Sequence, residues 1–195
     1  SALIARDADV LGALASRGLA RAYVSITTLD RKLARAMEPR AATPERRLAA
    51  VRALAEAGVP VGVGFAPVIP GLNDHEMEAV LERAAEAGAT SAMYVTLRLP
   101  LEIKDLFREW LEAERPDGAR KVMSLVRQMR GGRQRGRQWG ARMVGHGAYA
   151  DLIGKRFSRA CAALGLNLER KPLRTDLFRV PDDARPKPAQ MDLFG

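Results

Sequence analysis

Residues 7–115 alternate between helix-type and strand-type patterns, with only short links between them. A helical pattern ends at Gly18, and the strand-type segments 20–27, 59–68 and 91–97 are each followed by a further helical pattern. The middle segment is apolar along almost its whole length, as in parallel strands that are buried on both faces. Strand–helix units with short links favour parallel strands joined by right-handed crossovers. The alternation therefore predicts an α/β fold with three parallel strands.

Capping residues set the limits of the predicted helices. Thr43 has a side chain preferred at the N-cap, while Gly58 and Gly88 are typical residues just past a helix end. Asn73 or Asp74 is the expected cap of the helix that Gly88 ends. Because the same Glu-Ala-Gly triplet closes both helices, the two units are typical of a (β/α) barrel.

The alternation of strand-type and helix-type patterns ends after residue 116. A short amphipathic helix is expected over 119–129, followed by a basic stretch over 130–137 and a second helix over 151–164. A polar segment rich in Pro, Asp, Lys and Arg then leads to the C-terminus, a composition typical of disorder. We therefore predict three parts: a partial barrel over 1–116, a basic helical extension over 117–180 and a flexible tail over 181–195.

Charge and cysteine content limit the partners and cofactors. The net charge of +9 suits a nucleic-acid partner, although an Arg- and Ala-rich composition explains it equally well. The single cysteine, Cys161, excludes an internal disulfide and any zinc site or iron–sulfur cluster held by several thiolates of this chain. It also favours a reducing cytoplasm. The longest apolar run, 59–69, is too short and too interrupted by Gly and Pro to span a bilayer, and Ser1 is not followed by a secretory leader pattern.

Several segments occur in an order and spacing that resemble one enzyme family. They are YVSITTLD (23–30), MEPR (37–40), AGVPVGV (57–63), APVIPGLND (66–74) and YVTLRLP (94–100). Together they are similar to the fourth, fifth and sixth strands, with their loops, of radical S-adenosylmethionine (SAM) proteins. Within that family they most resemble the spore-photoproduct-lyase-like branch. The resemblance covers most of the chain.

The resemblance implies a lyase-like enzyme that cleaves SAM reductively at a [4Fe–4S] cluster and uses the resulting 5′-deoxyadenosyl radical to abstract hydrogen. The family binds its cluster on a CxxxCxxC loop after the first strand, and this sequence has no such motif. We therefore expect the second half of a radical SAM partial barrel, beginning near the end of the third strand. Three parallel strands are too few to close, and the first has an unpaired edge. We expect this part alone to be poorly stable and inactive.

Ligands of (β/α) barrels gather at the C-terminal ends of the strands. With the resemblance, this rule gives the candidate cofactor-binding residues Ser25, Thr27, Glu38, Arg40, Ala66, Pro67, Tyr94, Val95 and Thr96. The resemblance implies that Ser25, or else Thr27, bonds the ribose or methionyl group of SAM. Ala66 and Pro67 would support the adenine, and the backbone from Tyr94 onward would bond its edge. An ion pair between Glu38 and Arg40 would shape the pocket. Ordinary strand, core and surface roles remain open for all of them.

Two further segments suggest partners. Phosphate-neutralising charge and one aromatic ring occur together in Arg130, Arg133, Arg135, Arg137 and Trp139, which suits DNA or RNA, although a solvated loop is the alternative. The C-terminal residues Gln190, Leu193 and Phe194 resemble the peptide with which bacterial repair proteins bind the sliding clamp. These features support an alternative function as a non-catalytic nucleic-acid or clamp-binding module. No catalytic residue or metal ligand is assigned, and His75 and His146 are expected to have no catalytic role.

Overall fold

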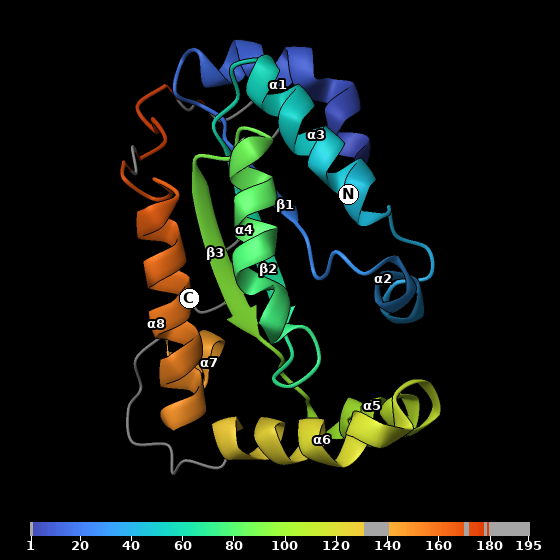
Figure 1. Ribbon diagram of the computed structural model, residues 1–195. Coiled ribbons are helices and arrows are strands. Elements are labelled where there is room, and N and C mark those ends of the chain that lie inside the picture. Colours follow the sequence, from blue (N-terminus) through green and yellow to red (C-terminus); the bar gives the residue numbers. More distant parts are fainter. Residues whose placement is uncertain (1, 131–140, 170–171, 178, 180–195) are drawn as a thin grey trace, which may run out of the picture.

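The computed structural model describes residues 2–130, 141–169, 172–177 and 179, which form one sheet and its surrounding helices (Figure 1). In chain order the elements are η1 (Ala2–Asp7), α1 (Ala8–Ala15), β1 (Ala22–Ser25), α2 (Arg31–Met37), α3 (Pro44–Glu56), β2 (Val61–Val68), η2 (Asp74–Glu76), α4 (Met77–Glu86), β3 (Ser91–Thr96), α5 (Leu101–Glu114), α6 (Pro116–Arg130), α7 (Ala141–Val144) and α8 (Ala148–Ala163).

Within the described part of the chain, β1, β2 and β3 form one open parallel sheet in that order. The predicted α/β fold with three parallel strands is thus confirmed, and the sheet has the organisation of a partial (β/α) barrel. One row of paired residues runs Ser25–Gly64–Met93, and a row two residues earlier runs Tyr23–Gly62–Ser91. All the C-terminal ends of the strands therefore lie at the same edge of the sheet.

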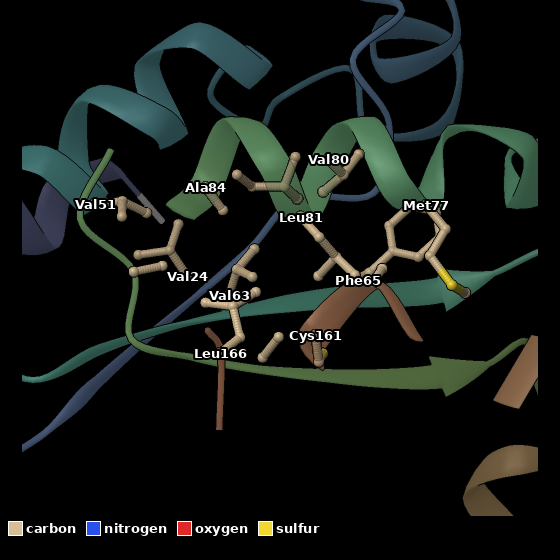
Figure 2. Close-up of a cluster of buried hydrophobic side chains, with 14 of the residues drawn as sticks. Val24, Val51, Val63, Phe65, Met77, Val80, Leu81, Ala84, Cys161 and Leu166 are labelled. Atoms are coloured by element: carbon tan, nitrogen blue, oxygen red, sulfur yellow. The ribbon is translucent and has the colours of Figure 1, made fainter. Parts of the chain in front are cut away.

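Helices α3 and α4 cover one face of the sheet. Val63 and Phe65 of β2 are fully buried there, and Figure 2 shows both side chains directed toward α4. Leu81 of α4 and Val51 of α3 belong to the same apolar cluster. Complete burial of each large aliphatic or aromatic side chain contributes about 1.5–3 kcal/mol, so this layer supplies most of the stability.

Helix α8 belongs to the same layer. Ile153 and Cys161 lie in the cluster that includes Val63, and the ring of Phe157 packs against Tyr94 of β3 with centroids 4.7 Å apart. Burial raises the pKa of the Cys161 thiol, so this cysteine is a buried, unreactive core residue as expected. The segment predicted as an extension therefore shares the core of the sheet.

Among the described elements, no helix covers the opposite face of the sheet. Tyr23 and Met93 are 41% and 45% exposed there, and Ser25 is exposed beside them. The Ser91 hydroxyl donates to the Tyr23 hydroxyl at 3.3 Å, so the tyrosine ring lies across Gly62. A Cβ atom at Gly62 would approach that ring and Ser91 far too closely. Tyr23 therefore covers the N-terminal half of this face, while the C-terminal half remains open.

Helices α5 and α6 lie beyond the C-terminal ends of the strands (Figure 1). Their buried residues, among them Leu111 and Val122, form a second apolar cluster with Ile69, which directly follows β2. The Trp110 indole N–H donates to the Ala36 carbonyl on α2 at 3.3 Å. The C-terminal edge of the sheet is thus bounded by packed helices on its outer side.

The predicted helix start at Thr43 is confirmed, since its hydroxyl accepts from the Arg46 N–H. The expectation that Asn73 or Asp74 caps the next helix is wrong, because α4 begins at Met77 after the short turn η2 and neither side chain caps it. Helix α2, which Asp30 caps through the N–H groups of Lys32 and Leu33, was not anticipated. Among the described helices, none has the length and apolar character required to cross a lipid bilayer.

Candidate functional site

The open half of the uncovered face is formed by one residue from each strand. Ser25 ends β1, Gly64 is its partner on β2 and Met93 is the partner of Gly64 on β3. Two residues further along β3, alternation of side chains places Val95 on the same face, and Ala66 occupies the corresponding position of β2, where the pairing with β3 becomes irregular. These residues lie at the edge where the ligands of (β/α) barrels bind, so they form the candidate site.

A buried arginine organises this edge. Arg47, in the first turns of α3, donates to the Ser25 carbonyl at 2.9 Å, to the Ala42 carbonyl at 3.0 Å and to Glu38 Oε2 at 2.8 Å. The same Nη1 atom that bonds the Ser25 carbonyl lies 3.5 Å from the Ser25 hydroxyl. With a side chain only 9% exposed, Arg47 needs these partners, because an unpaired buried charge is costly.

Glu38 connects the arginine to Thr27. Its Oε2 atom accepts from both Arg47 and the Thr27 hydroxyl, which lies 3.3 Å away. The Thr27 hydroxyl is also 3.2 Å from the Ala66 carbonyl, so a buried threonine joins the ends of β1 and β2. The side chain of Glu38 remains 40% exposed, and its Oε1 atom forms no hydrogen bond with any described residue. Ser25, Thr27, Glu38 and Ala66 are thus brought together around Arg47.

The amide of Asn73 fixes the loops that follow β1 and β2. Its Nδ2 donates to the Thr27 carbonyl at 2.7 Å and to the Pro67 carbonyl at 3.0 Å, while its Oδ1 accepts from the Ile69 N–H at 2.6 Å. Asn73 is completely buried. Every strong hydrogen-bonding position of this amide faces a backbone group, so Asn73 acts as a rigid connector between the two loops.

The residues predicted on β3 divide between the two faces. The side chain of Tyr94 lies on the helix-covered face against Phe157, and burial, with a smaller effect of Asp151, raises its pKa. Thr96 is buried and donates to the Met143 carbonyl at 3.0 Å. Only Val95 presents its side chain on the open face, so any contribution of Tyr94 and Thr96 comes from their backbone.

The ion pair of Glu38 is formed with Arg47, and the expectation that Arg40 is its partner is wrong. Arg40 is exposed in the loop after α2. Arg47 was not assigned a role from the sequence, although one signal was present. It lies four residues before Val51 and seven before Leu54, in line with the apolar stripe of its helix, where a charged residue needs buried partners.

A second polar cluster lies between α4 and α8. The Tyr149 hydroxyl donates to Asp74 Oδ2 at 2.7 Å, and burial, followed by this hydrogen bond, raises the pKa of Tyr149 to about 12. Arg156 binds Glu78 with two hydrogen bonds, of which the shorter is 2.6 Å. These contacts attach α8 to the start of α4, and Asp74 Oδ1 also accepts from the Gly71 N–H. The cluster therefore has a structural role.

The predicted partner-binding residues lie outside the described residues. These are Arg133, Arg135, Arg137 and Trp139, and the tail residues Gln190, Leu193 and Phe194; Arg130 ends α6, and its side chain is not described. The two histidines, His75 and His146, are exposed. Among the described residues, no group of three or more His, Cys, Asp or Glu side chains could hold a metal ion.

The sequence of this chain is similar to one known protein family and to several uncharacterized proteins. The sequence model of the family described as the radical SAM superfamily matches residues 3–84, which include β1 and β2. Uncharacterized proteins of Mycobacterium bovis and Mycobacterium tuberculosis are each 31% identical over 127 residues, which is 64% of this chain and 37% of theirs. An uncharacterized protein of Acidianus two-tailed virus is 34% identical over 93 residues, 45% of this chain and 30% of its own. No solved structure matches the chain significantly.

Proposed function

We propose that this chain forms one wall of the SAM site of a radical SAM enzyme of the lyase-like, spore-photoproduct-lyase-related type. The observation that carries the proposal is the open C-terminal edge of the sheet, where Ser25 and Glu38 present free hydrogen-bonding positions within the segment that matches the radical SAM family. The chain spans well under half the length of the curated relatives that it matches, so the activity of the whole protein is part of the proposal.

The residues present fit a nucleoside. The hydroxyl of Ser25 and the Oε1 atom of Glu38 are a donor and an acceptor suited to ribose or methionyl oxygens and ribose hydroxyls. Ala66 and Val95, with Gly64 between Ser25 and Met93, give this face apolar groups of the kind that support a purine. SAM bound there would supply the radical chemistry of the family, while the described side chains bind and orient it.

The same residues do not fit the [4Fe–4S] cluster. Such clusters are held by several cysteine thiolates, and this chain contains only Cys161, which is buried on α8. On the proposed function the cluster is therefore bound by residues outside this chain, and we assign no step of electron transfer to it.

Direct binding measurements test the proposal. We expect the chain to bind radiolabelled SAM saturably in equilibrium dialysis. Ser25→Ala and Glu38→Gln should each weaken the affinity about 5- to 50-fold, the usual cost of losing one hydrogen bond to a neutral or charged group. Glu38→Gln keeps the size of the side chain but removes its charge, so it also weakens the pair with Arg47.

Exposed residues away from the open face provide matched controls. Ser158→Ala on α8 and Glu82→Gln on α4 make the same chemical changes and should leave the affinity within about twofold of the unaltered chain, because exposed surface changes have small effects. If the unaltered chain shows no saturable binding, or if the control and site variants behave alike, the proposed SAM wall is rejected.

The substrate of the whole enzyme is proposed to be DNA or RNA, on the support of the net charge and the basic residues 130–137. The residues Gln190, Leu193 and Phe194 are likewise proposed as a sliding-clamp peptide, supported by their resemblance to that motif and by the two apolar anchors that Leu193 and Phe194 provide. A non-catalytic nucleic-acid or clamp-binding module remains the second candidate function, and it would bind nucleic acid without binding SAM.

Salt dependence tests the nucleic-acid proposal. Replacing Arg133, Arg135 and Arg137 together with glutamine should reduce the slope of log affinity against log salt by about 2 to 3, because each lost phosphate contact contributes slightly less than one unit. A fluorescent single-stranded DNA titrated at several salt concentrations gives this slope. A control variant with Arg17, Arg52 and Arg120 replaced, all exposed and in other elements, loses the same charge. Equal slopes for both variants would argue against a local binding segment.

A further inference from the structure

Arg47 connects the interior of the protein to the open face of the sheet. Its guanidinium is buried, and all three of its nitrogens donate to groups at the end of β1 or in the loop before α3. Any buried guanidinium needs acceptors for its N–H groups, so the identity of these acceptors, rather than their number, bears on its role. Here the bonded acceptors include the backbone and, at longer range, the hydroxyl of Ser25, which is the polar residue on the open face.

The position of this cation determines how the Ser25 hydroxyl can be oriented. A guanidinium only donates hydrogen bonds, so the hydroxyl oxygen presents a lone pair toward Nη1, 3.5 Å away, and its hydrogen points elsewhere. The hydroxyl has no other partner among the described residues, and Ser25 is exposed. Its hydrogen is therefore available to a ligand on the open face.

Glu38 is oriented as a hydrogen-bond acceptor, which complements the donor role of Ser25. Arg47 and Thr27 both donate to Oε2, which fixes one carboxylate oxygen and leaves Oε1 free to accept. One buried cation thus holds a donor and an acceptor side by side at the edge of the sheet. A ribose with neighbouring hydroxyls, each of which both donates and accepts, matches such a pair.

We infer that Arg47 is a positioning residue for nucleoside binding: it orients Ser25 as a hydrogen-bond donor and Glu38 as an acceptor toward the ribose of the ligand. This inference rests on the proposed function, because it assumes that the open face binds SAM. It adds the residue that orients the two binding groups and the direction of each hydrogen bond. Arg47 itself does not touch the ligand.

A change at Arg47 separates positioning from simple attachment of α3. Arg47→Lys retains the charge, but a single ammonium cannot reproduce the planar fork that reaches Ser25, Ala42 and Glu38 together. We expect about a tenfold loss of SAM affinity in equilibrium dialysis, the equivalent of about one well-oriented hydrogen bond. Arg46→Lys, at the exposed neighbouring position, should change the affinity by less than about twofold.

A double-variant comparison tests whether Arg47 acts through Ser25. If Arg47 orients Ser25, adding Arg47→Lys to Ser25→Ala should weaken binding less than Arg47→Lys does alone, because the oriented group is already gone. A purely structural role would lower the thermal midpoint equally in both backgrounds and would give independent effects on affinity. Independent effects would overturn the inference.

Substitutions of Ser25 alone keep the test decisive if Arg47→Lys fails to fold. Ser25→Thr retains a hydroxyl donor on a strand position and should keep the affinity within about threefold, while Ser25→Cys, a weak donor, should bind as poorly as Ser25→Ala. Equal affinities for the threonine and cysteine variants would contradict the donor role. Failure of the unaltered chain to bind SAM would instead reject the proposed function, so the two failures are distinguishable.

Discussion

Replacing Asn73 with aspartate is expected to cost about 3 kcal/mol or more in the free energy of unfolding, although the two side chains have nearly the same shape. The introduced carboxylate can still accept from the Ile69 N–H. It cannot donate to the carbonyls of Thr27 and Pro67, which would face a buried negative charge instead of an N–H. Urea denaturation monitored by circular dichroism measures the loss. Because protonation of the new carboxyl restores one donor, the deficit should shrink as the pH falls from 7 toward 5.

Asn167 provides the matched control for this change. Its amide contacts the backbone in the same way, since Oδ1 accepts from the Ala92 N–H at 2.9 Å and Nδ2 donates to the Ala92 carbonyl at 3.0 Å. Asn167 is exposed, so water can solvate a carboxylate there. Asn167→Asp should therefore cost only about 1 kcal/mol. Equal losses for the two variants would show that the burial of Asn73 does not determine its contribution.

Asn73 is also connected to the candidate site through hydrogen bonds. Thr27 follows β1 and Pro67 lies near the end of β2, and Asn73 is one of the side chains that connect these two segments. Thr27 in turn shares Glu38 with Arg47. Stability at this edge and the orientation of the binding groups therefore depend on the same hydrogen bonds.

The parallel strands and the start of α3 could be predicted because they depend on local patterns. The buried strand Val61–Val68 follows from a continuous apolar run, and the start of α3 follows from the Thr43 cap. The choice of Ser25 as a candidate residue follows from its place at the end of a predicted strand and from the rule that barrel ligands bind at the C-terminal ends of strands. Each of these predictions needed only residues close together in the sequence.

The parts that escaped prediction depend on long-range contacts. Asn73 has the residue type of a helix cap, but its amide bonds Thr27, which is 46 positions earlier in the chain. Arg47 reaches Ser25 across 22 positions, and no local pattern reveals that partner. Tyr94 follows the strand pattern, yet only the placement of α8 shows that its ring lies on the covered face, away from the site. Local patterns therefore indicated the edge of the sheet where the candidate site lies, whereas tertiary contacts determine its hydrogen bonding.

Two glycines at equivalent helix ends are expected to respond differently to the same substitution. Gly58 and Gly88 follow α3 and α4 with φ angles of 75° and 97°, in the region that side chains disfavour. A Cβ atom at Gly58 would meet nothing within 4 Å, but at Gly88 it would lie 2.6 Å from the Cβ atom of Ala55. We expect Gly58→Ala to cost about 1 kcal/mol, from backbone strain partly offset by the stiffer unfolded chain. Gly88→Ala should cost about 3 kcal/mol, because overpacking adds to that strain.

The difference between the two glycines can be assigned to one contact. Ala55→Gly removes the atom that Gly88→Ala would strike, at a cost of about 1 kcal/mol for a glycine inside α3. In urea denaturation, adding Ala55→Gly to Gly88→Ala should therefore recover stability, whereas adding it to Gly58→Ala should only lose more. Since Ala55 and Gly88 join the two helices that cover the sheet, a missing recovery would mean that α3 and α4 can move apart at this point.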